Sequence, residues 1–463
     1  MEYDFIVHPG GNPDQIKLKI NDADKVTLTD KGELVVKTRI GEVHEKTPVS
    51  YNEAGKAIAT HFVMDKDGSL GFAGAFPKNK TLRIDPEVVW ATYYGGSELE
   101  YGNNCAVDSA GNAYLIGETA STSGIASGGF QNTYGGSTID AFLVKFSTSG
   151  ARLWATYYGG ASYDSAQSCK VDANGAIYLA GYTNSVSAIA SGGAQNTLAG
   201  SYDAFLVKFT SSGTRSWGTY FGATGRDHGY NCALDASGNV YLSGFTESAT
   251  GIASSGYQST FGGGTQDAFL AKFSSTGSRL WSTYYGGTGV DYAEDTTADS
   301  DGNIYLAGYT TSTSGIASGG FQNSHGGGTR DAYLAKFDAS GSRIWATYYG
   351  GSASDYGYSC ATDSNGDVYL SGSTSSSGLA SGGHQNTTGP NYKTDAILVK
   401  FNSSGNRLWA TYYGQADEDD GASSCMVDSS GNVYIAGTTG SATGIASGGF
   451  QNTKPGGLDM YIA

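Results

Sequence analysis

An acidic residue stands ten positions after each tryptophan, and these acids are the first candidates for chemistry in this chain. Carboxylates gathered at one place repel one another unless a cation or a donor-rich ligand neutralises them, so the pattern suggests Ca²⁺ or a polyhydroxylated ligand. The alternative is that each acid bonds the backbone amides of its own loop or stays solvated. The candidate metal ligands are Glu100, Asp164, Asp227, Asp291, Asp355 and Asp419.

A second recurring group pairs an aromatic residue with glutamine inside a long loop rich in glycine and serine. Aromatic faces and side-chain amides can stack on and hydrogen-bond to a sugar or a peptide. The alternative is that the apolar residues only pin the loop to the protein body. The candidate ligand-binding residues are Phe130, Gln131, Tyr257, Gln258, Phe321, Gln322, Phe450 and Gln451, and Ala194 and His384 break the series.

Two further acidic positions fit structural roles better. Strings such as Asp299-Ser-Asp-Gly-Asn resemble calcium loops only faintly, because they lack the glycine at position six and the distal glutamate, so we expect Asx turns. An aspartate also precedes every Ala-Phe-Leu-like run without variation, which indicates a role in the architecture of the repeat. These residues are Asp140, Asp203, Asp267, Asp331, Asp395 and Asp459.

No catalytic constellation is present in the sequence. His228, His325 and His384 stand at different repeat positions, and no HExxH string, nucleophile motif or Cys/His metal spacing occurs. Catalysis needs an asymmetric set of groups, which near-perfect repetition disfavours. We therefore expect a protein that is not an enzyme and that has no cofactor, except for the Ca²⁺ that the acids suggest.

A repeat of about 64 residues must position all of these groups. The tryptophans are Trp90, Trp154, Trp217, Trp281, Trp345 and Trp409, at spacings of 64, 63, 64, 64 and 64 residues. The five cysteines, Cys105, Cys169, Cys232, Cys360 and Cys425, recur at one position of the repeat, where Thr296 takes the place of a sixth cysteine in the fourth copy. We expect them to be equivalent small core thiols rather than disulfide partners.

Each copy divides into four strand-like runs separated by turn residues. They are exemplified by Trp154-Ala-Thr-Tyr-Tyr, Cys105-Ala-Val-Asp, Ala113-Tyr-Leu-Ile-Gly and Asp140-Ala-Phe-Leu-Val-Lys-Phe, and the long loop joins the last two. Four antiparallel strands per copy are typical of one blade of a β-propeller. We expect the small residues of the Cys run to form the innermost strand and the Trp run the outermost, with the acids and the long loops on the same face.

The number of runs predicts a six-bladed propeller over residues 87–463. The array starts with an outer strand and ends one outer strand short, so the first Trp run is expected to complete the last blade and remove exposed edges. A seven-bladed propeller truncated at the C-terminus would give the same partial count. Residues 1–86 lack the repeat, and their alternating runs predict a small β-sandwich-like domain or roll.

Composition excludes several classes of partner. Lys plus Arg number 27 against 43 Asp plus Glu, a net charge of -16, which is opposite to the basic surface that nucleic acids require. No apolar run is long enough to insert in a membrane, and the first residues lack the pattern of a signal peptide. Nothing in the composition calls for a partner chain, and we expect a monomer.

With the repeat parsed, the sequence resembles bacterial SBBP (β-propeller repeat) proteins. Their units read like the W-x-T-Y-Y-G-G, V-D-x-x-G-N-x-Y-L-x-G-x-T and D-A-F-L-V-K-F strings of this chain, and the likeness covers about residues 87–463. Residues 1–86, with Tyr3-Asp-Phe-Ile-Val-His-Pro-Gly, look like part of the domain of unknown function that often precedes this array. The resemblance implies an exported or cell-surface protein and no family-wide activity.

The function expected from these observations is a non-enzymatic extracellular or cell-surface adhesion module that binds glycans or proteins through repeated loops. Weak equivalent sites engaged together would gain affinity through effective concentration. The first alternative is a structural spacer or scaffold in a larger surface protein. The second, suggested only by the clustered carboxylates, is a polysaccharide hydrolase or lyase.

Overall fold

The protein consists of two compact units, Met1–Thr92 and Tyr93–Ala463, where the sequence suggested a boundary after residue 86. The computed structural model describes residues 5–8, 11–20, 23–29, 32, 34–38, 41–45, 47–52, 57–66, 68–76, 82–85, 92–136, 138–388, 393–415, 418–446, 454 and 457–463. Apart from one 3-10 turn, η1 (Pro13–Gln15), every regular element among these residues is a strand.

The first unit contains two antiparallel sheets. The larger has the order β1 (Phe5–Val7), β8 (Leu82–Asp85), β5 (Val49–Asn52), β6 (Ala57–Met64), β7 (Leu70–Gly74), and the smaller is β2 (Lys25–Leu28), β3 (Leu34–Thr38), β4 (Gly41–Glu45). Leu34 and Val36 of the smaller sheet share one buried cluster with Phe62, Leu70 and Phe72 of the larger. Two sheets that enclose a common core form a small sandwich.

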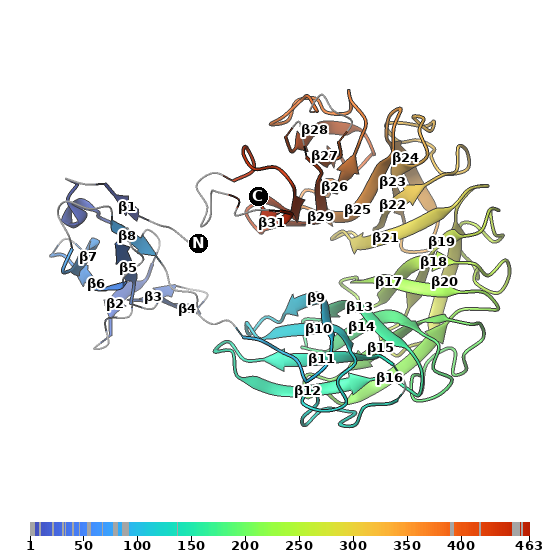
Figure 1. Ribbon diagram of the computed structural model, residues 1–463, viewed down its shortest axis with the longest axis horizontal. Coiled ribbons are helices and arrows are strands. Elements are labelled where there is room, and N and C mark those ends of the chain that lie inside the picture. Colours follow the sequence, from blue (N-terminus) through green and yellow to red (C-terminus); the bar gives the residue numbers. More distant parts are fainter. Residues whose placement is uncertain are drawn as a thin grey trace. The chain divides into compact units, whose positions relative to one another are not determined.

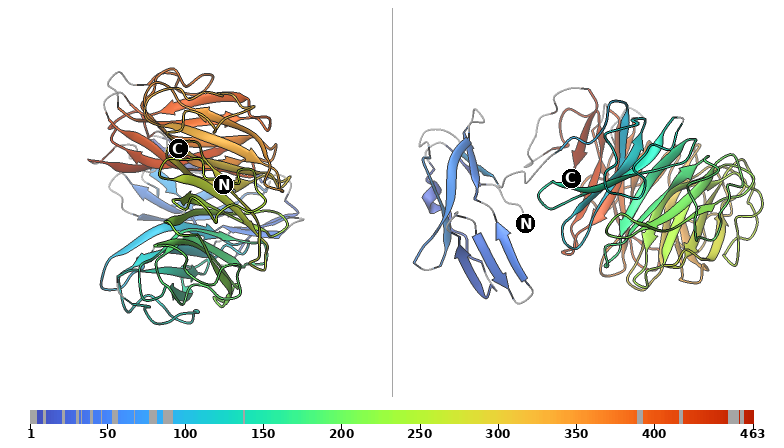
Figure 2. Two further views of the ribbon diagram at one scale, coloured as in Figure 1. Left: turned by 90° about the vertical axis from the view of Figure 1, so that its right-hand side faces the viewer. Right: turned by 90° about the horizontal axis from the view of Figure 1, so that it is seen from below.

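The second unit is a six-bladed β-propeller, which confirms the fold predicted from the repeat. Figure 1 shows its sheets side by side around a common axis, with the first strand of a blade, such as β9, innermost and the fourth, such as β12, outermost, and Figure 2 gives two side views. In order, the strands are β9 (Glu100–Val107), β10 (Ala113–Thr119), β11 (Asp140–Phe146), β12 (Arg152–Tyr158); β13 (Asp164–Val171), β14 (Ile177–Thr183), β15 (Asp203–Phe209), β16 (Arg215–Phe221); β17 (Asp227–Leu234), β18 (Val240–Thr246), β19 (Asp267–Phe273), β20 (Arg279–Tyr285); β21 (Asp291–Ala298), β22 (Ile304–Thr310), β23 (Asp331–Phe337), β24 (Arg343–Tyr349); β25 (Asp355–Thr362), β26 (Val368–Thr374), β27 (Asp395–Phe401), β28 (Arg407–Tyr413); and β29 (Asp420–Val427), β30 (Val433–Thr439), β31 (Asp459–Ile462).

Neighbouring blades are joined by the repeated tryptophan. The indole Nε1 of Trp154 donates to the carbonyl of Ser211 in the next blade at 3.0 Å, and its ring covers Gly213, where a Cβ would approach the indole to 2.8 Å. Gly213 has φ +82°, so the turn requires glycine for its backbone as well as for the contact. The same bond recurs at Trp217, Trp281 and Trp345.

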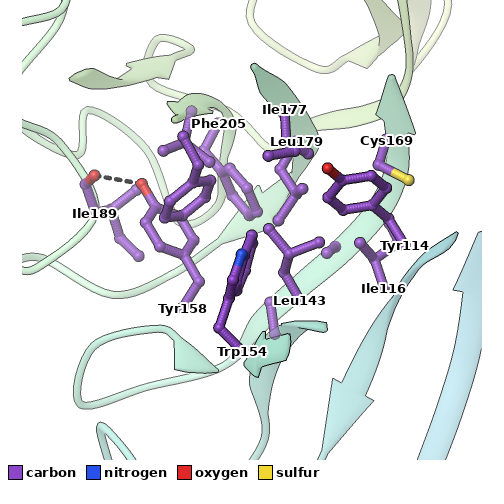
Figure 3. Close-up of a cluster of buried hydrophobic side chains, with 14 of the residues drawn as sticks. Tyr114, Ile116, Leu143, Trp154, Tyr158, Cys169, Ile177, Leu179, Ile189 and Phe205 are labelled. Atoms are coloured by element: carbon purple, nitrogen blue, oxygen red, sulfur yellow. Dashed lines mark hydrogen bonds between the residues drawn. The ribbon is translucent and has the colours of Figure 1, made fainter. Parts of the chain in front are cut away.

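The hydrophobic core lies between the blades rather than within each one. One buried cluster combines Tyr114, Leu143 and Trp154 of the first blade with Cys169 and Phe205 of the second (Figure 3). The Tyr158 hydroxyl crosses the same junction and donates to the carbonyl of Ile189 at 2.5 Å, as the dashed line in Figure 3 shows. Each blade therefore depends on its neighbours for burial of its apolar faces.

The two end blades each have a face without a neighbour among the described residues. The described part of the last blade is a three-stranded sheet, β29-β30-β31, and no pairing links it to the first blade. Figure 1 shows these two blades on either side of an opening in the ring. Tyr101 on β9 and Met460 on β31 are 56% and 88% exposed. Trp90, which was expected to complete the last blade, lies outside the described residues.

This geometry predicts that one thiol per native chain reacts with a disulfide reagent such as DTNB. Cys105 is exposed on the first blade, whereas the other four cysteines are buried and free. Burial raises the pKa of Cys232 to about 11 and of Cys425 to about 12, which keeps those thiols inert. Full labelling is expected only after unfolding. Cys105→Ser removes the native signal, and a native chain with no reactive thiol would contradict the open first blade.

Candidate functional site

The repeated acids begin the innermost strands, and their oxygens are used within the blades. Asp291 is fully buried and accepts hydrogen bonds from the hydroxyls of Thr310 and Ser312 (2.9 Å) and from the backbone N–H of Gly287 (2.9 Å). Equivalent Thr and Ser bonds recur at Asp164, Asp227 and Asp355, and Thr119 donates to Glu100 at 2.9 Å. This geometry supports the structural interpretation of these residues.

Asp419 does not hold the sixth position, which is a correction to the sequence interpretation. The loop before β29 is one residue longer than its counterparts, so Asp420 starts the strand and accepts from Ser441 at 2.7 Å. Asp419 instead forms a more exposed ion pair with Lys393, at 3.4 Å. Counting a fixed ten residues from tryptophan fails because the register of β29 with β30, not the loop length, places the acid.

The acids are not gathered at one place. No group of three or more His, Cys, Asp or Glu side chains that could hold a metal ion occurs in the described part of the chain. In the second to sixth blades the inner-strand acid instead lies near one acid of the preceding blade: a Cβ on Gly159 would lie 2.7 Å from Oδ1 of Asp140 and 2.7 Å from Oδ2 of Asp164. The calcium hypothesis stays a prediction that this geometry does not support.

These acid pairs explain the invariant aspartate of the third strand. Oδ2 of Asp140 accepts from the N–H of Gly135, but Oδ1 is buried with no hydrogen-bond partner, and the same holds for Oδ1 of Asp267 and Asp331. Burial and the neighbouring acid raise the pKa of Asp140, Asp267 and Asp331 to about 7. Burial disfavours the charged form of each of these carboxyls, and repulsion by the neighbouring acid adds to this effect.

The long loops begin beside the acids, where Ser185 donates to Asp164 at 2.8 Å, and then lie along the outer strands. Ser127 bridges to Ala155 and Gln131 to Tyr157, both on the outermost strand β12 of the same blade. The loop therefore covers the open edge of the blade.

The side chains of these loops are used in local contacts. The ring of Phe130 lies under the Arg215 guanidinium of the next blade, 4.4 Å from its centroid, and Gln131 donates from Nε2 to the carbonyl of Thr133 at 3.0 Å. Tyr257 with Arg343 and Phe321 with Arg407 repeat the first contact, and Gln258 and Gln322 repeat the second. Phe450 and Gln451 lie outside the described residues.

A β-bulge in each inner strand creates a different candidate site. The register of β21 with β22 shifts between Ala293 and Asp295, which leaves Glu294 as the extra residue. Gly308 permits the shift, because a Cβ there would lie 1.8 Å from the carbonyl oxygen of Tyr292. Bulges re-aim side chains and often accompany functional sites. The corresponding bulge residues of the other blades are Asn103, Gln167, Tyr230, Tyr358 and Ser423.

The bulge residues differ from blade to blade, and so do their neighbours, whereas most of the repeat does not. We call the group formed by these variable residues in the first five blades the axial patch, because they sit where the inner strands begin. It comprises Asn103, Glu118, Tyr163, Gln167, Tyr182, Tyr202, Arg226, His228, Tyr230, Phe245, Glu247, Gln266, Tyr292, Glu294, Tyr309, Arg330, Tyr356 and Tyr358. Sequence reasoning missed it by following invariance, although the variation between copies was the available signal.

Aromatic rings form most of the axial patch. Tyr182 and His228 stack with centroids 3.9 Å apart and planes 3° apart. Burial lowers the pKa of His228 to about 4, so this imidazole is neutral at pH 7. Tyr292 contacts Tyr309 at 4.9 Å, and Tyr309 contacts Tyr356 at 5.0 Å. Because nearly all of these rings are only half-buried, part of their surface remains available to a ligand.

Polar groups stand among the rings. Glu118 accepts hydrogen bonds from the hydroxyls of Tyr163 (2.8 Å) and Ser165 (2.5 Å) and from the Asn103 amide (3.3 Å). The Arg226 Nε donates to Glu247 at 2.9 Å. Aromatic faces combined with fixed carboxylates, amides and guanidinium groups are the composition of a binding surface for a polar ligand.

The acid pairs predict a protein that is more stable in mild acid than at pH 8. A carboxyl whose folded pKa is near 7 and whose unfolded pKa is about 4 stabilises the fold fully below about pH 4, and this contribution is lost as the pH rises through 7. Asp235, Asp338 and Asp363 have lowered pKa values and act oppositely, losing stability below about pH 4.

The thermal unfolding midpoint, measured by circular dichroism, should therefore be highest near pH 4 and fall as the pH rises to about 7, with little further change from these groups up to pH 8. The combined substitution Asp140→Asn, Asp267→Asn and Asp331→Asn mimics the protonated carboxyls and should flatten the fall between about pH 4 and 7. A midpoint that rises steadily from pH 5 to pH 8 in the unmodified chain would contradict the raised pKa of these buried carboxyls.

Comparison with known proteins agrees with this architecture. Residues 89–124, 280–315, 344–380 and 408–443 match the SBBP β-propeller repeat, and residues 1–87 match a domain of unknown function, DUF7948. The last three SBBP matches begin in an outer strand and continue through the first two strands of the following blade, so the sequence repeat straddles two blades. No helix of the described residues is long and apolar enough to span a membrane.

Two curated proteins are similar to part of the chain. An uncharacterized WD repeat-containing protein of Acanthamoeba polyphaga mimivirus is 25% identical over 365 residues, which are 64% of this chain and 26% of that protein. The regulatory protein FlaEY of Caulobacter vibrioides is 29% identical over 172 residues, 36% of this chain and 18% of its own length. The chain thus spans about a quarter or less of these relatives.

Two solved structures share only a distant likeness. A gluconolactonase from Xanthomonas campestris has 12% identity and a TM-score of 0.27, covering 78% of this chain and 95% of its own. A putative gluconolactonase has 10% identity and a TM-score of 0.28, covering 77% and 87%. The repeat matches and the N-terminal match, together with the six blades, identify the chain as an SBBP β-propeller repeat protein with an N-terminal DUF7948 domain.

Proposed function

We propose that this chain is a non-enzymatic binding module at the cell surface, and that it holds its ligand, a glycan or a protein segment, on the axial patch. The observation that carries the proposal is the distribution of differences among the repeats. Residues that join the blades are the same in nearly every copy, whereas the bulge residues Gln167, Tyr230, Glu294 and Tyr358 are of three chemical kinds. A frame needs repetition, but recognition of one ligand needs asymmetry.

The outer loops are a weaker candidate for the binding surface. Phe130 and Tyr257 each carry an arginine of the next blade on their ring faces, so those faces are occupied. The glutamine amides beside them are bonded to the backbone of their own loops. The side chains of the axial patch have no such uniform local use, since each blade contributes a different group.

A structural scaffold is the second candidate, favoured by the uncovered faces of the two end blades. Val107 on the first blade and Met426 on the last are 65% and 61% exposed, and their counterparts in inner blades are more buried. Such apolar strand surfaces can pack against another sheet. In that case the chain would act through assembly, and the axial patch would be dispensable.

Binding to a glycan array and to a peptide array distinguishes these functions. The patch variant Tyr182→Ala, Tyr309→Ala and Tyr356→Ala should lose at least about tenfold in affinity, because an aromatic contact contributes about 0.5–1.5 kcal/mol and 1.4 kcal/mol is tenfold. The matched outer-loop variant Phe130→Ala, Tyr257→Ala and Phe321→Ala should keep the affinity of the unmodified chain. Near-ultraviolet circular dichroism checks that both variants fold.

The reverse pattern, with loss of affinity only in the outer-loop variant, would rule out the axial patch as the binding surface and favour the outer loops instead. No binding by the folded chain on either array would favour the scaffold. Release of sugars from a polysaccharide panel by the unmodified chain would contradict the non-enzymatic assignment.

A further inference from the structure

Glu294 is the one carboxylate of the axial patch without a described partner. It stands at the bulge of β21 and is half-buried, and no hydrogen bond or ion pair reaches it from the described residues. Glu118 accepts four hydrogen bonds, and Glu247 is paired with Arg226. Burial, with a smaller effect of Asp295, raises the pKa of Glu294 to about 7, as expected for a carboxyl that lacks a donor.

An arc of six aromatic rings accompanies this carboxylate. The consecutive contacts are Tyr230–Phe245 at 5.6 Å, Phe245–Tyr292 at 5.0 Å, Tyr292–Tyr309 at 4.9 Å, Tyr309–Tyr356 at 5.0 Å and Tyr356–Tyr358 at 5.7 Å between centroids. Burial, together with the charge of Glu294, raises the pKa of Tyr230, Tyr292, Tyr309 and Tyr358. These four rings come from three successive blades, so the carboxylate lies within electrostatic reach of rings on either side of it.

The arc already holds one cation at its edge. The guanidinium of Arg330 lies 5.7 Å from the centroid of Tyr309 and 5.5 Å from that of Tyr356, and it donates to the Tyr356 hydroxyl at 2.8 Å. Among the described residues no hydrogen bond or ion pair joins Arg330 to Glu294, and its guanidinium is directed to Tyr356 instead. The rings therefore accept a cation, while the acid beside them remains uncompensated.

We propose that Glu294 and this aromatic arc bind an organic ammonium group, which deepens the proposed function by naming part of the ligand. Electron-rich ring faces attract an ammonium ion, and the attraction is strongest for a weakly hydrated, alkylated one. The Glu294 carboxylate supplies a negative charge, which no ion pair among the described residues neutralises. Choline and the side chain of a trimethylated lysine share this chemistry.

Other neutralising partners fit the site less well. Ca²⁺ takes six to eight oxygen ligands, and the described residues offer no group of three metal-ligating side chains here. A neutral sugar would leave the charge of Glu294 in place. An inorganic monovalent cation is strongly hydrated and would make no use of six rings.

Calorimetric titration of the full chain at pH 8 with choline tests the proposal. The matched control ligand is 3,3-dimethyl-1-butanol, which replaces the nitrogen with carbon and has the same shape without charge. We expect choline to bind at least about tenfold more tightly than the neutral isostere. Equal affinities would show that shape and not charge is recognised, and would overturn the proposal.

Variants locate the site. Glu294→Gln and, separately, Tyr309→Leu should each weaken choline binding by about tenfold. Asp419→Asn, an exposed acid outside the axial patch, and Tyr257→Leu, a tyrosine of the outer loops, should leave it unchanged. Retained affinity in a folded Glu294→Gln chain, shown by an unchanged thermal midpoint without ligand, would also overturn the proposal.

A peptide bearing trimethyllysine, tested against the same peptide with unmodified lysine and with acetyllysine, separates the sources of the ammonium group. Binding of choline alone would indicate a small metabolite, whereas preference for the methylated peptide would indicate a protein partner. If neither binds but an array ligand still depends on Tyr182 and Tyr309, this inference fails while the proposed function stands. Loss of all binding to the patch would remove both.

Discussion

The contact of each tryptophan with the next blade is the interaction on which the structure depends. An isolated four-stranded sheet exposes two apolar faces, and four buried clusters of the propeller each combine residues of two adjacent blades. The indole of Trp281, for example, covers Gly341 and donates to the carbonyl of Ala339 across the junction. This contact needs a turn residue that has positive φ and no Cβ, so tryptophan and glycine must recur together. The period of the sequence follows from this requirement.

A second constraint acts at the inner strands and creates the room for function. The glycine of each second strand lets the inner strand bulge, and the extra residue is released from strand pairing. At these positions the frame imposes no identity, so Gln167, Tyr230, Glu294 and Tyr358 differ although their blades are nearly alike. The axial patch is thus a consequence of a repeated defect in otherwise regular sheets. The buried acid pairs lie at the junctions between blades instead, and they make the stability of the propeller depend on pH.

Much of the fold followed from the sequence because the dominant signals are local and periodic. Strand order, the inner position of the cysteines and the six blades all came from the runs around Trp154 and Cys105. The site did not follow, for two physical reasons. The acids after each tryptophan are bonded to Thr and Ser hydroxyls, and the loops containing Phe130 run along outer strands, neither of which composition reveals. The register of β29 displaced the sixth acid to Asp420, and only pairing with Thr439 shows this.

The central claim is that the packing of the blades does not depend on the side chains of the axial patch. Exchanging patch residues between blades tests this claim most directly. A chain carrying Tyr230→Gln, Glu294→Gln, Tyr309→Ser and Tyr358→Ser receives at each position a residue type that another blade already has at the equivalent position. Its thermal unfolding midpoint should stay within a few degrees of that of the unmodified chain, with the same cooperativity. A midpoint lowered as far as by Trp281→Leu would show that the patch holds the blades together, and would contradict the account.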